Sequence, residues 1–191
     1  RIPFAWPGFC GTIQYTLLYG RYGCYMRLPD MQLEKMIIKG EDKSSMGQSM
    51  GQKMETLLGA EDIEKLESFD DGVSGYFYQM FSYLMEFMEN GINEGKFTEE
   101  QAREDREIAL WYAFACLNID EYEYYWRAAQ WMPASEKYAA GCGVWYYRYS
   151  VALLYCGRIR ESWEYAEKGV KEEPSYPWTW LQAAKLRSFF G

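Results

Sequence analysis

The chain has 191 residues and a formal net charge of −8, and 49% of its residues are hydrophobic, with 8 Trp, 18 Tyr and 10 Phe. A composition this rich in large apolar side chains is typical of a folded protein and excludes an intrinsically disordered chain. The sequence contains no histidine, which excludes histidine-based catalytic triads, histidine general bases and the common histidine zinc sites. The chemistries that remain for an enzyme are a carboxylate pair, a Tyr or Lys base and a Cys nucleophile, and none of these has a recognisable spacing here.

The cysteines are odd in number and form no C-x-x-C pair, so neither a zinc ribbon nor a thioredoxin-type motif is present. They are Cys10, Cys24, Cys116, Cys142 and Cys156. We expect all five to be reduced, the last three to lie in the core, and the protein to need no metal or other cofactor. The first residues lack the order of a signal peptide, and the longest apolar runs are about half the roughly 20 residues of a membrane-spanning helix. These features favour a cytoplasmic protein with no membrane partner.

Acidic residues concentrate in the middle of the chain. Between Glu61 and Glu107 there are fourteen acidic and four basic residues, which gives this segment a charge of −10 and the remainder +2. Such a segment repels a phosphate backbone, so nucleic acid is not an expected partner. The segment is either a solvated helical surface or a docking face for a basic protein, and the candidate docking residues are Glu99, Glu100 and Glu104.

Residues 1–29 are rich in Gly, Pro and aromatic residues, and their secondary structure has two interpretations. The stretch 12–28 fits a short hairpin around the turn "GRYG", and it also fits two short helices. Because every later segment has helical periodicity, we favour helices. Pro29 and Asp30 then begin a further helix, which Gly40 ends.

The tetrapeptide "SMGQ" occurs twice in the next segment. It places Met46, Met50 and Met54 on one face of a helix, with Gly47 and Gly51 beside them. This face is either an adaptable binding surface or, as we favour, a close helix crossing that the glycines allow.

Two helices are predicted after residue 70. Residues 71–96 carry apolar side chains at intervals of three and four and predict a long helix, whose end is marked by Gly91 and Gly95. A second helix, over residues 97–118, begins with Thr98 as its N-cap, and Gln101 three residues later completes a capping box.

A fixed period is present in the last part of the chain. Tyr112, Tyr146 and Trp180 are equally spaced, and the same interval separates Gly157 from Gly191. The best unit, residues 143–176, reads as two helices joined at Gly157-Arg158 and closed by Pro174.

The side chains of this unit suit close helix packing. In the first helix Tyr146, Ser150 and Leu153 face one side, and in the second helix Ser162, Ala166 and Gly169 form a stripe of small residues. Small residues allow two helices to approach closely. The unit has the period of a tetratricopeptide repeat, a pair of antiparallel helices about 34 residues long, and it resembles that family. The resemblance covers residues 100–191. The preceding unit divides at Asn118–Asp120 and has Pro133 inside its second helix. Residues 177–191 supply a further first helix, which is either a capping helix or part of a truncated repeat.

We therefore expect an all-α fold of stacked antiparallel helix pairs, a tetratricopeptide-like superhelix, with only a short hairpin near the N-terminus as an alternative. An N-terminal helical region (1–97) and a repeat region (98–191) are expected to form one continuous unit.

The resemblance implies a non-catalytic scaffold that binds a protein or peptide on the exposed surface of its first helices. The candidate surface consists of Val144, Tyr147, Val151, Leu154 and Tyr155, while Tyr146, Tyr149 and Leu153 should pack inward. The tyrosine rings of this surface would either contact a partner or cover a neighbouring helix. Two alternatives remain: a small acidic inhibitor or immunity-type protein, and a carboxylate enzyme that acts on carbohydrate on an all-α scaffold.

Overall fold

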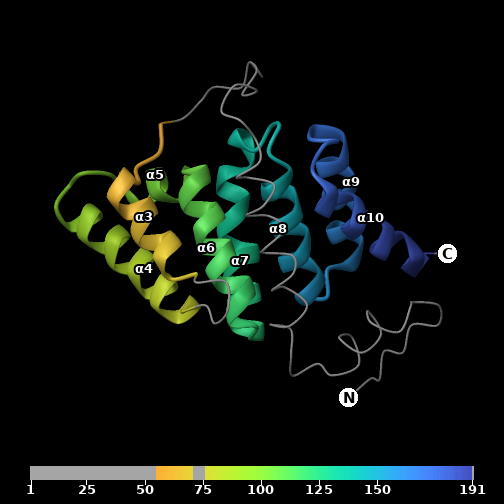
Figure 1. Ribbon diagram of the computed structural model, residues 1–191, viewed down its shortest axis with the longest axis horizontal. Helices are drawn as coiled ribbons and strands as arrows, with labels where there is room; N and C mark the ends of the chain where they lie inside the picture. The colour runs from red at the N-terminus through yellow and green to blue at the C-terminus, as the bar shows by residue number, and fades with distance from the viewer. Residues whose placement is uncertain (1–54, 71–75, 191) are drawn as a thin grey trace. The chain divides into compact units, whose positions relative to one another are not determined.

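The computed structural model describes residues 55–70 and 76–190, which fall within one compact unit, Gln48–Gly191. Every regular element in these two ranges is helical, which confirms the predicted all-α class (Figure 1). The hairpin or helices predicted over residues 12–28, the helix predicted after Pro29 and the methionine face at residues 46–54 lie outside the described residues.

The described residues form helices that follow one another along the chain. They are α3 (Ala60–Ser68), α4 (Phe77–Asn93), α5 (Glu99–Glu104), α6 (Arg106–Ile119), α7 (Tyr122–Trp131), the 3-10 helix η1 (Met132–Tyr138), α8 (Gly143–Tyr155), α9 (Ile159–Glu172) and α10 (Pro177–Phe190). Helix α6 packs on α4, α7 and α8, and α8 packs in turn on α9 and α10. Helices α7 and α9 each contact the helix before and the helix after them. None of the helices in residues 55–70 and 76–190 is both long enough and apolar enough to cross a membrane.

Helix α4 presents one apolar face to the rest of the molecule. Phe77, Met80, Leu84 and Met88 recur at intervals of three and four and are buried, as the periodicity predicted. Gly91 does not end this helix, contrary to the prediction, because it lies within the last turns and is buried against the ring of Phe97. The helix ends just before Gly95, which has a positive φ of 71°. Helix α4, which lies before residue 97, packs on α6, which lies after it. The two predicted regions, 1–97 and 98–191, therefore contact each other through these helices.

Asp105 divides the region predicted as one helix over residues 97–118 into two helices. The predicted capping box is present at the start of α5, where Thr98 Oγ1 accepts the N–H of Gln101 at 3.2 Å and Gln101 Oε1 accepts the N–H of Thr98 at 2.8 Å. Asp105, however, has an extended backbone and is the N-cap of α6. The prediction of a single helix was therefore wrong. Asp105 is not a charged surface residue within a helix, because its side chain caps the N-terminus of a new helix.

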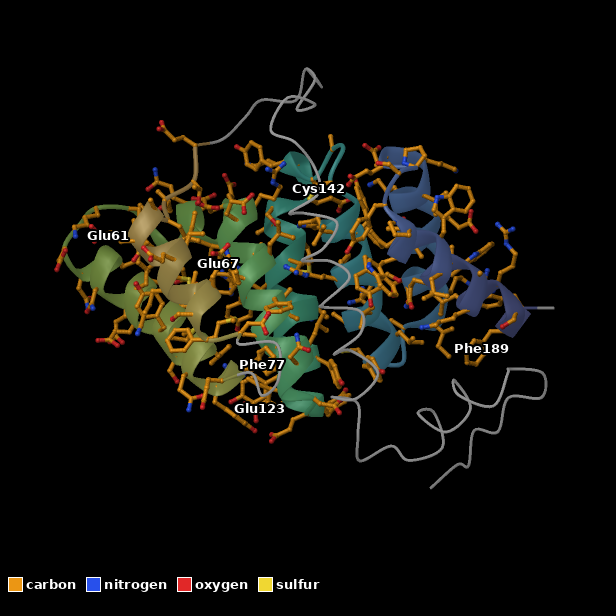
Figure 2. The ribbon with its side chains drawn as sticks, viewed as in Figure 1. Glu61, Glu67, Phe77, Glu123, Cys142 and Phe189 are labelled. Atoms are coloured by element: carbon orange, nitrogen blue, oxygen red, sulfur yellow. The ribbon has the colours of Figure 1, made fainter. Side chains whose placement is uncertain are left out.

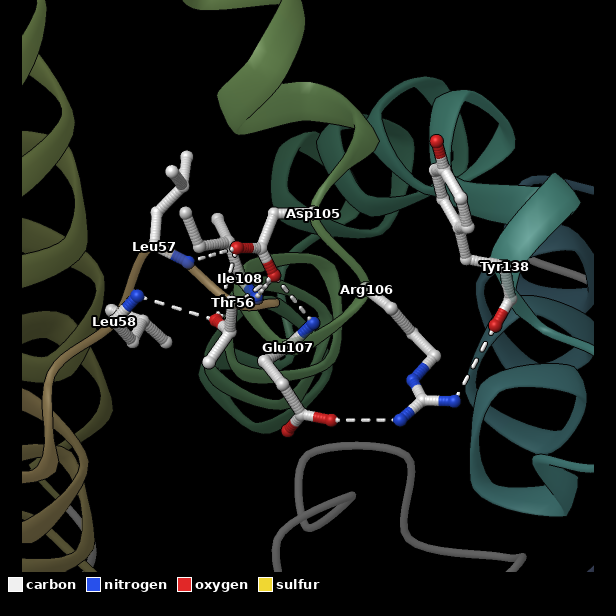
Figure 3. A network of polar contacts seen from close by, with 8 residues as sticks. All are labelled: Thr56, Leu57, Leu58, Asp105, Arg106, Glu107, Ile108 and Tyr138. Atoms are coloured by element: carbon white, nitrogen blue, oxygen red, sulfur yellow. Dashed lines mark hydrogen bonds and ion pairs between the residues drawn. The ribbon is translucent and has the colours of Figure 1, made fainter. Parts of the chain in front are cut away.

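The carboxylate of Asp105 also connects two segments that are distant in sequence (Figure 3). Its oxygens accept the N–H groups of Glu107 at 2.8 Å and Ile108 at 3.1 Å, which lie in the first turn of α6. They also accept the N–H of Leu57 at 2.6 Å and the hydroxyl of Thr56 at 3.0 Å. A buried carboxylate is stable only when hydrogen bonds replace its water, and these four donors do so. Asp105 is therefore a structural residue that holds residues 55–58 at the start of α6.

The α6–α7 connection follows the predicted division at Asn118–Asp120. Asp120 ends α6 with a left-handed backbone, φ 63°, and the Tyr125 hydroxyl donates a hydrogen bond to its carboxylate. Pro133 marks the change from α7 to the 3-10 helix η1, because a proline is accepted in the first turn of a new helix and not inside an old one.

Helices α8 and α9 form the pair that the repeat unit over residues 143–176 predicts. Gly157, with φ 77°, makes the turn between them, and the small stripe Ser162, Ala166 and Gly169 is buried. Ser162 and Gly169 lie against α8, and Ala166 packs with Ala183 and Leu186 of α10. The closest approach is at Gly169, where an added Cβ would lie 2.6 Å from the Cβ of Tyr146. Tyr146, Tyr149 and Leu153 are buried, so their predicted inward orientation is confirmed.

Candidate functional site: an aromatic group on α7 and α8

The predicted surface on α8 has both exposed and buried members. Val144, Tyr147 and Leu154 are half-buried, and Val151 is buried, so Val151 offers almost no surface for a partner. Leu154 packs against the small apolar cluster between α9 and α10. Tyr155 is exposed. Of the five residues, Tyr155 is thus the only one that is exposed.

Both tyrosines of this surface also contact neighbouring elements. The Tyr147 ring lies 6.2 Å from the Tyr176 ring and 6.3 Å from the Trp178 ring, between centroids, at the start of α10. The Tyr155 ring stacks on Tyr125 of α7, with 4.3 Å between centroids and 9° between the ring planes. Tyr147 and Tyr155 are about 12 Å apart along the helix axis, so they belong to different ends of α8.

Two further exposed aromatic residues lie beside this stack, on α7. Tyr122 and Trp126 are four residues apart on one side of the helix, and their exposed fractions are 66% and 51%, compared with 41% for Tyr155. Tyr125, which is buried, lies between them in sequence and carries the stacked ring. We refer to Tyr122, Tyr125, Trp126 and Tyr155 as the α7–α8 aromatic group.

The aromatic surface continues from α7 toward α4. Tyr124 contacts Phe81 at 5.1 Å and Tyr78 at 5.8 Å between ring centroids, and the Tyr78 hydroxyl donates a hydrogen bond to Glu121. This hydrogen bond raises the pKa of Tyr78 to about 12, so its hydroxyl remains protonated and a donor at neutral pH. Figure 2 shows Phe77, at the start of α4, and Glu123, at the start of α7, at the same end of these helices.

Carboxylates border the aromatic group. Glu121 and Glu123 are exposed at the start of α7, and Glu123 binds Arg127 at 2.6 Å. The ring edges and faces offer contact area with few rotatable bonds, while the hydroxyls and carboxylates can bond to polar groups of a ligand. This arrangement can hold an apolar side chain that has a backbone amide or a cation beside it.

The predicted acidic docking residues are partly neutralised by neighbouring cations. Glu99 forms an ion pair with Arg103 at 3.2 Å, and Glu104 forms one with Lys137 at 2.7 Å. Glu99, Glu100, Arg103, Glu104 and Ala134 line an open depression of about 450 Å³. The larger excess of acid lies along residues 55–70 and 76–95, which hold nine acidic residues and one lysine. Glu61 and Glu67 of this set are seen on α3 (Figure 2).

The described part of the chain offers little for metal or thiol chemistry. No group of three or more His, Cys, Asp or Glu side chains within residues 55–70 and 76–190 is placed to hold a metal ion. Cys116, Cys142 and Cys156 are free thiols. Cys116 lies in the core as predicted, but Cys142 and Cys156 are half-buried, so their predicted core position was wrong. Burial raises the pKa of the Cys116 thiol well above its usual value, which keeps it in the unreactive protonated form.

The sequence shows that residues 122–131 are rich in aromatic side chains, but the repeat period does not single out Tyr122 and Trp126. The stretch "YEYYWRAAQW" holds aromatic residues at four of its first five positions, so spacing alone does not show which of them face solvent. The structure separates them, since Tyr125 contacts α8, Tyr124 contacts α4, and Tyr122 and Trp126 remain exposed.

Comparison of the chain with protein-family models, with curated proteins and with solved structures finds no match.

Proposed function

We propose that this protein is a non-catalytic scaffold that binds a protein or peptide, and that the α7–α8 aromatic group is its main contact surface. The observation that carries this proposal is the exposure of Tyr122 and Trp126 on α7 and of Tyr155, whose ring stacks on Tyr125 of the same helix α7. Large aromatic side chains that remain in water next to one another are typical of interaction sites, and Tyr and Trp are the residues most enriched at binding hot spots. The stacked helix pairs, which resemble tetratricopeptide repeats, supply a rigid support for them.

The surroundings of the aromatic group indicate the chemistry of the partner. The exposed carboxylates Glu121 and Glu123 lie at the start of the same helix as Tyr122 and Trp126, and the whole chain carries a charge of −8. A peptide with one or two aromatic or long aliphatic side chains would contact these rings, and a neighbouring Lys or Arg would meet Glu121, since Glu123 is already paired with Arg127.

The proposal is tested with random peptides displayed on phage and selected on the purified full-length chain. Selected peptides should bind the wild-type protein, and Trp126→Ala should weaken their binding at least tenfold, as expected for truncation of a hot-spot aromatic residue. Trp180→Ala is the matched control, because Trp180 is also an exposed tryptophan on a helix, at 53% exposure, and lies outside the group. Circular dichroism should show the same helical content for both variants.

Equal affinity of the selected peptides for the wild-type protein and for Trp126→Ala would remove the aromatic group as the binding site. The variants Tyr122→Ala and Tyr155→Ala then extend the test across the group, and Tyr147→Ala tests the other end of the predicted α8 surface.

A second candidate function is that of an acidic inhibitor that covers a basic site on another protein. The nine acidic residues and one lysine of residues 55–70 and 76–95 favour it. In that case the selected peptides should be rich in Lys and Arg, and their affinity should fall steeply with salt. Charge reversal at Glu61 and Glu67 would then weaken binding, while Trp126→Ala would have little effect.

A further inference from the structure

The connection between α6 and α7 contains a residue with an unusual backbone conformation. Asp120, the C-cap of α6, is left-handed, with φ 63° and ψ 36°, and no other non-glycine residue in the described ranges has a positive φ. At the connection between α8 and α9 the left-handed residue is Gly157. Glycine adopts this conformation without strain, whereas the Cβ of any other residue is crowded there. Because a glycine would make the same turn more easily, the contacts of the Asp120 side chain indicate why an aspartate stands here.

The Asp120 side chain contacts the next helix. Its carboxylate accepts a hydrogen bond from the hydroxyl of Tyr125, five residues later, on α7. Tyr125 is buried, with an exposed fraction of 4%, so little water competes for this bond. The hydroxyl is the end of the side chain that lies farthest from its own backbone. The bond to Asp120 and the backbone of α7 therefore hold the Tyr125 ring at both ends.

The Tyr125 ring in turn supports a ring of α8. Tyr155 stacks on it with 4.3 Å between centroids and 9° between planes, a closer and more nearly parallel stack than the 4.7 Å and 19° of Tyr112 and Trp131. Tyr155 is the last residue of α8 and is exposed. An exposed side chain at a helix end has several rotamers open to it, and the stack favours one of them.

Three helices thus meet through three side chains, since Asp120 ends α6, Tyr125 lies in α7 and Tyr155 ends α8. We propose that Asp120 is a positioning residue for the peptide-binding surface. It fixes the ring of Tyr125, and that ring fixes the ring of Tyr155 in the orientation that a peptide meets. This inference rests on the proposed function of the α7–α8 aromatic group and adds a residue that acts on the group through Tyr125.

The advantage of this arrangement is that the surface is ordered before the peptide arrives. A side chain that is already held in its bound orientation loses less conformational freedom on binding, so more of the contact energy appears as affinity. Without the acceptor at Asp120 the peptide itself would have to order the two rings. We expect this to weaken binding about three- to tenfold, the range that corresponds to ordering one such side chain.

Two substitutions separate the Asp120 side chain from the turn that its backbone makes. Asp120→Gly removes the acceptor and keeps the left-handed conformation, so α6 and α7 should still fold. Asp120→Asn keeps an acceptor oxygen for the Tyr125 hydroxyl, and asparagine is also accepted in the left-handed region. A positioning role predicts that Gly impairs the surface and that Asn preserves it.

The first measurement is the orientation of the Tyr155 ring in the absence of any ligand. The full-length chain is labelled at its tyrosines, and the NMR signals of the Tyr155 ring are identified by their loss in Tyr155→Phe. A stacked ring moves the signals of its neighbour upfield, because its circulating π electrons oppose the applied field above and below its plane. This upfield shift should be smaller in Asp120→Gly and should be retained in Asp120→Asn. An unchanged shift in Asp120→Gly would overturn the proposal.

The second measurement is affinity for the peptides that phage display selects on the wild-type chain. Asp120→Gly should weaken binding about three- to tenfold and Asp120→Asn less than about twofold. In a Tyr155→Ala background Asp120→Gly should cause no further loss, because the ring that it positions is gone. Tyr165→Phe is the matched control: it removes another tyrosine–carboxylate bond, to Glu136 at 2.9 Å, outside the aromatic group, and should leave the affinity unchanged.

The outcomes separate this inference from the proposed function. If Trp126→Ala weakens binding and Asp120→Gly does not, the aromatic group binds the peptide and Asp120 is not a positioning residue. If Trp126→Ala has no effect, the proposed function fails and this inference fails with it. A loss of affinity in Asp120→Gly that persists in the Tyr155→Ala background would show a general effect on the fold and would also contradict the positioning role.

Discussion

The helix pairs α6–α7 and α8–α9 are neighbours that are held together in different ways. In α8–α9 the backbones approach at Gly169, and Ser150 and Ser162 exchange hydrogen bonds between the two helices. In α6–α7 the pair is joined through large rings, of which Tyr112 and Trp131 stack with 4.7 Å between centroids and 19° between planes. A pair of the first kind should be damaged most by added atoms, and a pair of the second kind by removed atoms.

Truncation of Trp131 to Ala should have the largest effect. Trp131 is buried, stacks on Tyr112 and lies 4.9 Å below the guanidinium of Arg103, so its loss opens a cavity and removes a cation–π contact. We expect a loss of about 3 to 5 kcal/mol in the free energy of unfolding, measured by urea denaturation.

Trp131→Phe is the matched control for this experiment. No acceptor for the indole N–H of Trp131 is found in the described part of the chain, so a phenyl ring that keeps the stack should cost far less than Ala. If Phe and Ala destabilised the protein equally, the ring stack would not be what joins α6 and α7.

The same contrast explains how much of the fold the sequence could predict. The α8–α9 pair was predicted with its turn, its stripe and its buried face, because small residues at helical spacing and a glycine between helices are local signals. The start of α6 was not predicted, because the role of Asp105 depends on Thr56 and Leu57, which lie far earlier in the chain.

The candidate site was harder to predict than the fold. Periodicity placed Tyr155 on the surface, but the exposure of Tyr122 and Trp126 depends on which aromatic residues of α7 the rings of α4 and α8 cover. Val151 was expected on the surface from its place on the helix, and the tertiary structure buries it.

The substitution Gly169→Ala, in the α8–α9 pair, should have the next largest effect on the free energy of unfolding. The Cβ of Gly169→Ala would lie 2.6 Å from the Cβ of Tyr146 and 2.7 Å from the Cγ2 of Thr179. Of these two atoms only the Cβ of Tyr146 is fixed by its own backbone, and it cannot move without a shift of α8. Although Ala favours a helix by about 1 kcal/mol over Gly, we expect this contact to produce a net loss of about 2 kcal/mol.

Gly91→Ala serves as the comparison for Gly169→Ala. Its Cβ would meet the far end of the Phe97 ring, a side chain that can rotate, so the loss should be smaller. A larger loss at Gly91 than at Gly169 would contradict the view that α8–α9 is the pair with the closer backbones.

Removal of the serine hydroxyls between α8 and α9 should have the smallest effect on the free energy of unfolding. The effects of the two substitutions should also depend on each other. Ser150 Oγ donates to the carbonyl oxygen of Ser162 at 2.7 Å, Ser162 Oγ donates to that of Ser150 at 2.7 Å, and the two hydroxyl oxygens are 3.0 Å apart. Either single substitution, Ser150→Ala or Ser162→Ala, leaves the other hydroxyl buried with one partner fewer, which should cost about 1 kcal/mol. The double variant removes both polar groups from the same buried site, so its loss should be smaller than the sum of the two single losses by at least about 0.5 kcal/mol. Strictly additive losses in urea denaturation would show that the two hydroxyls act independently and that close packing alone, centred on Gly169, joins α8 to α9.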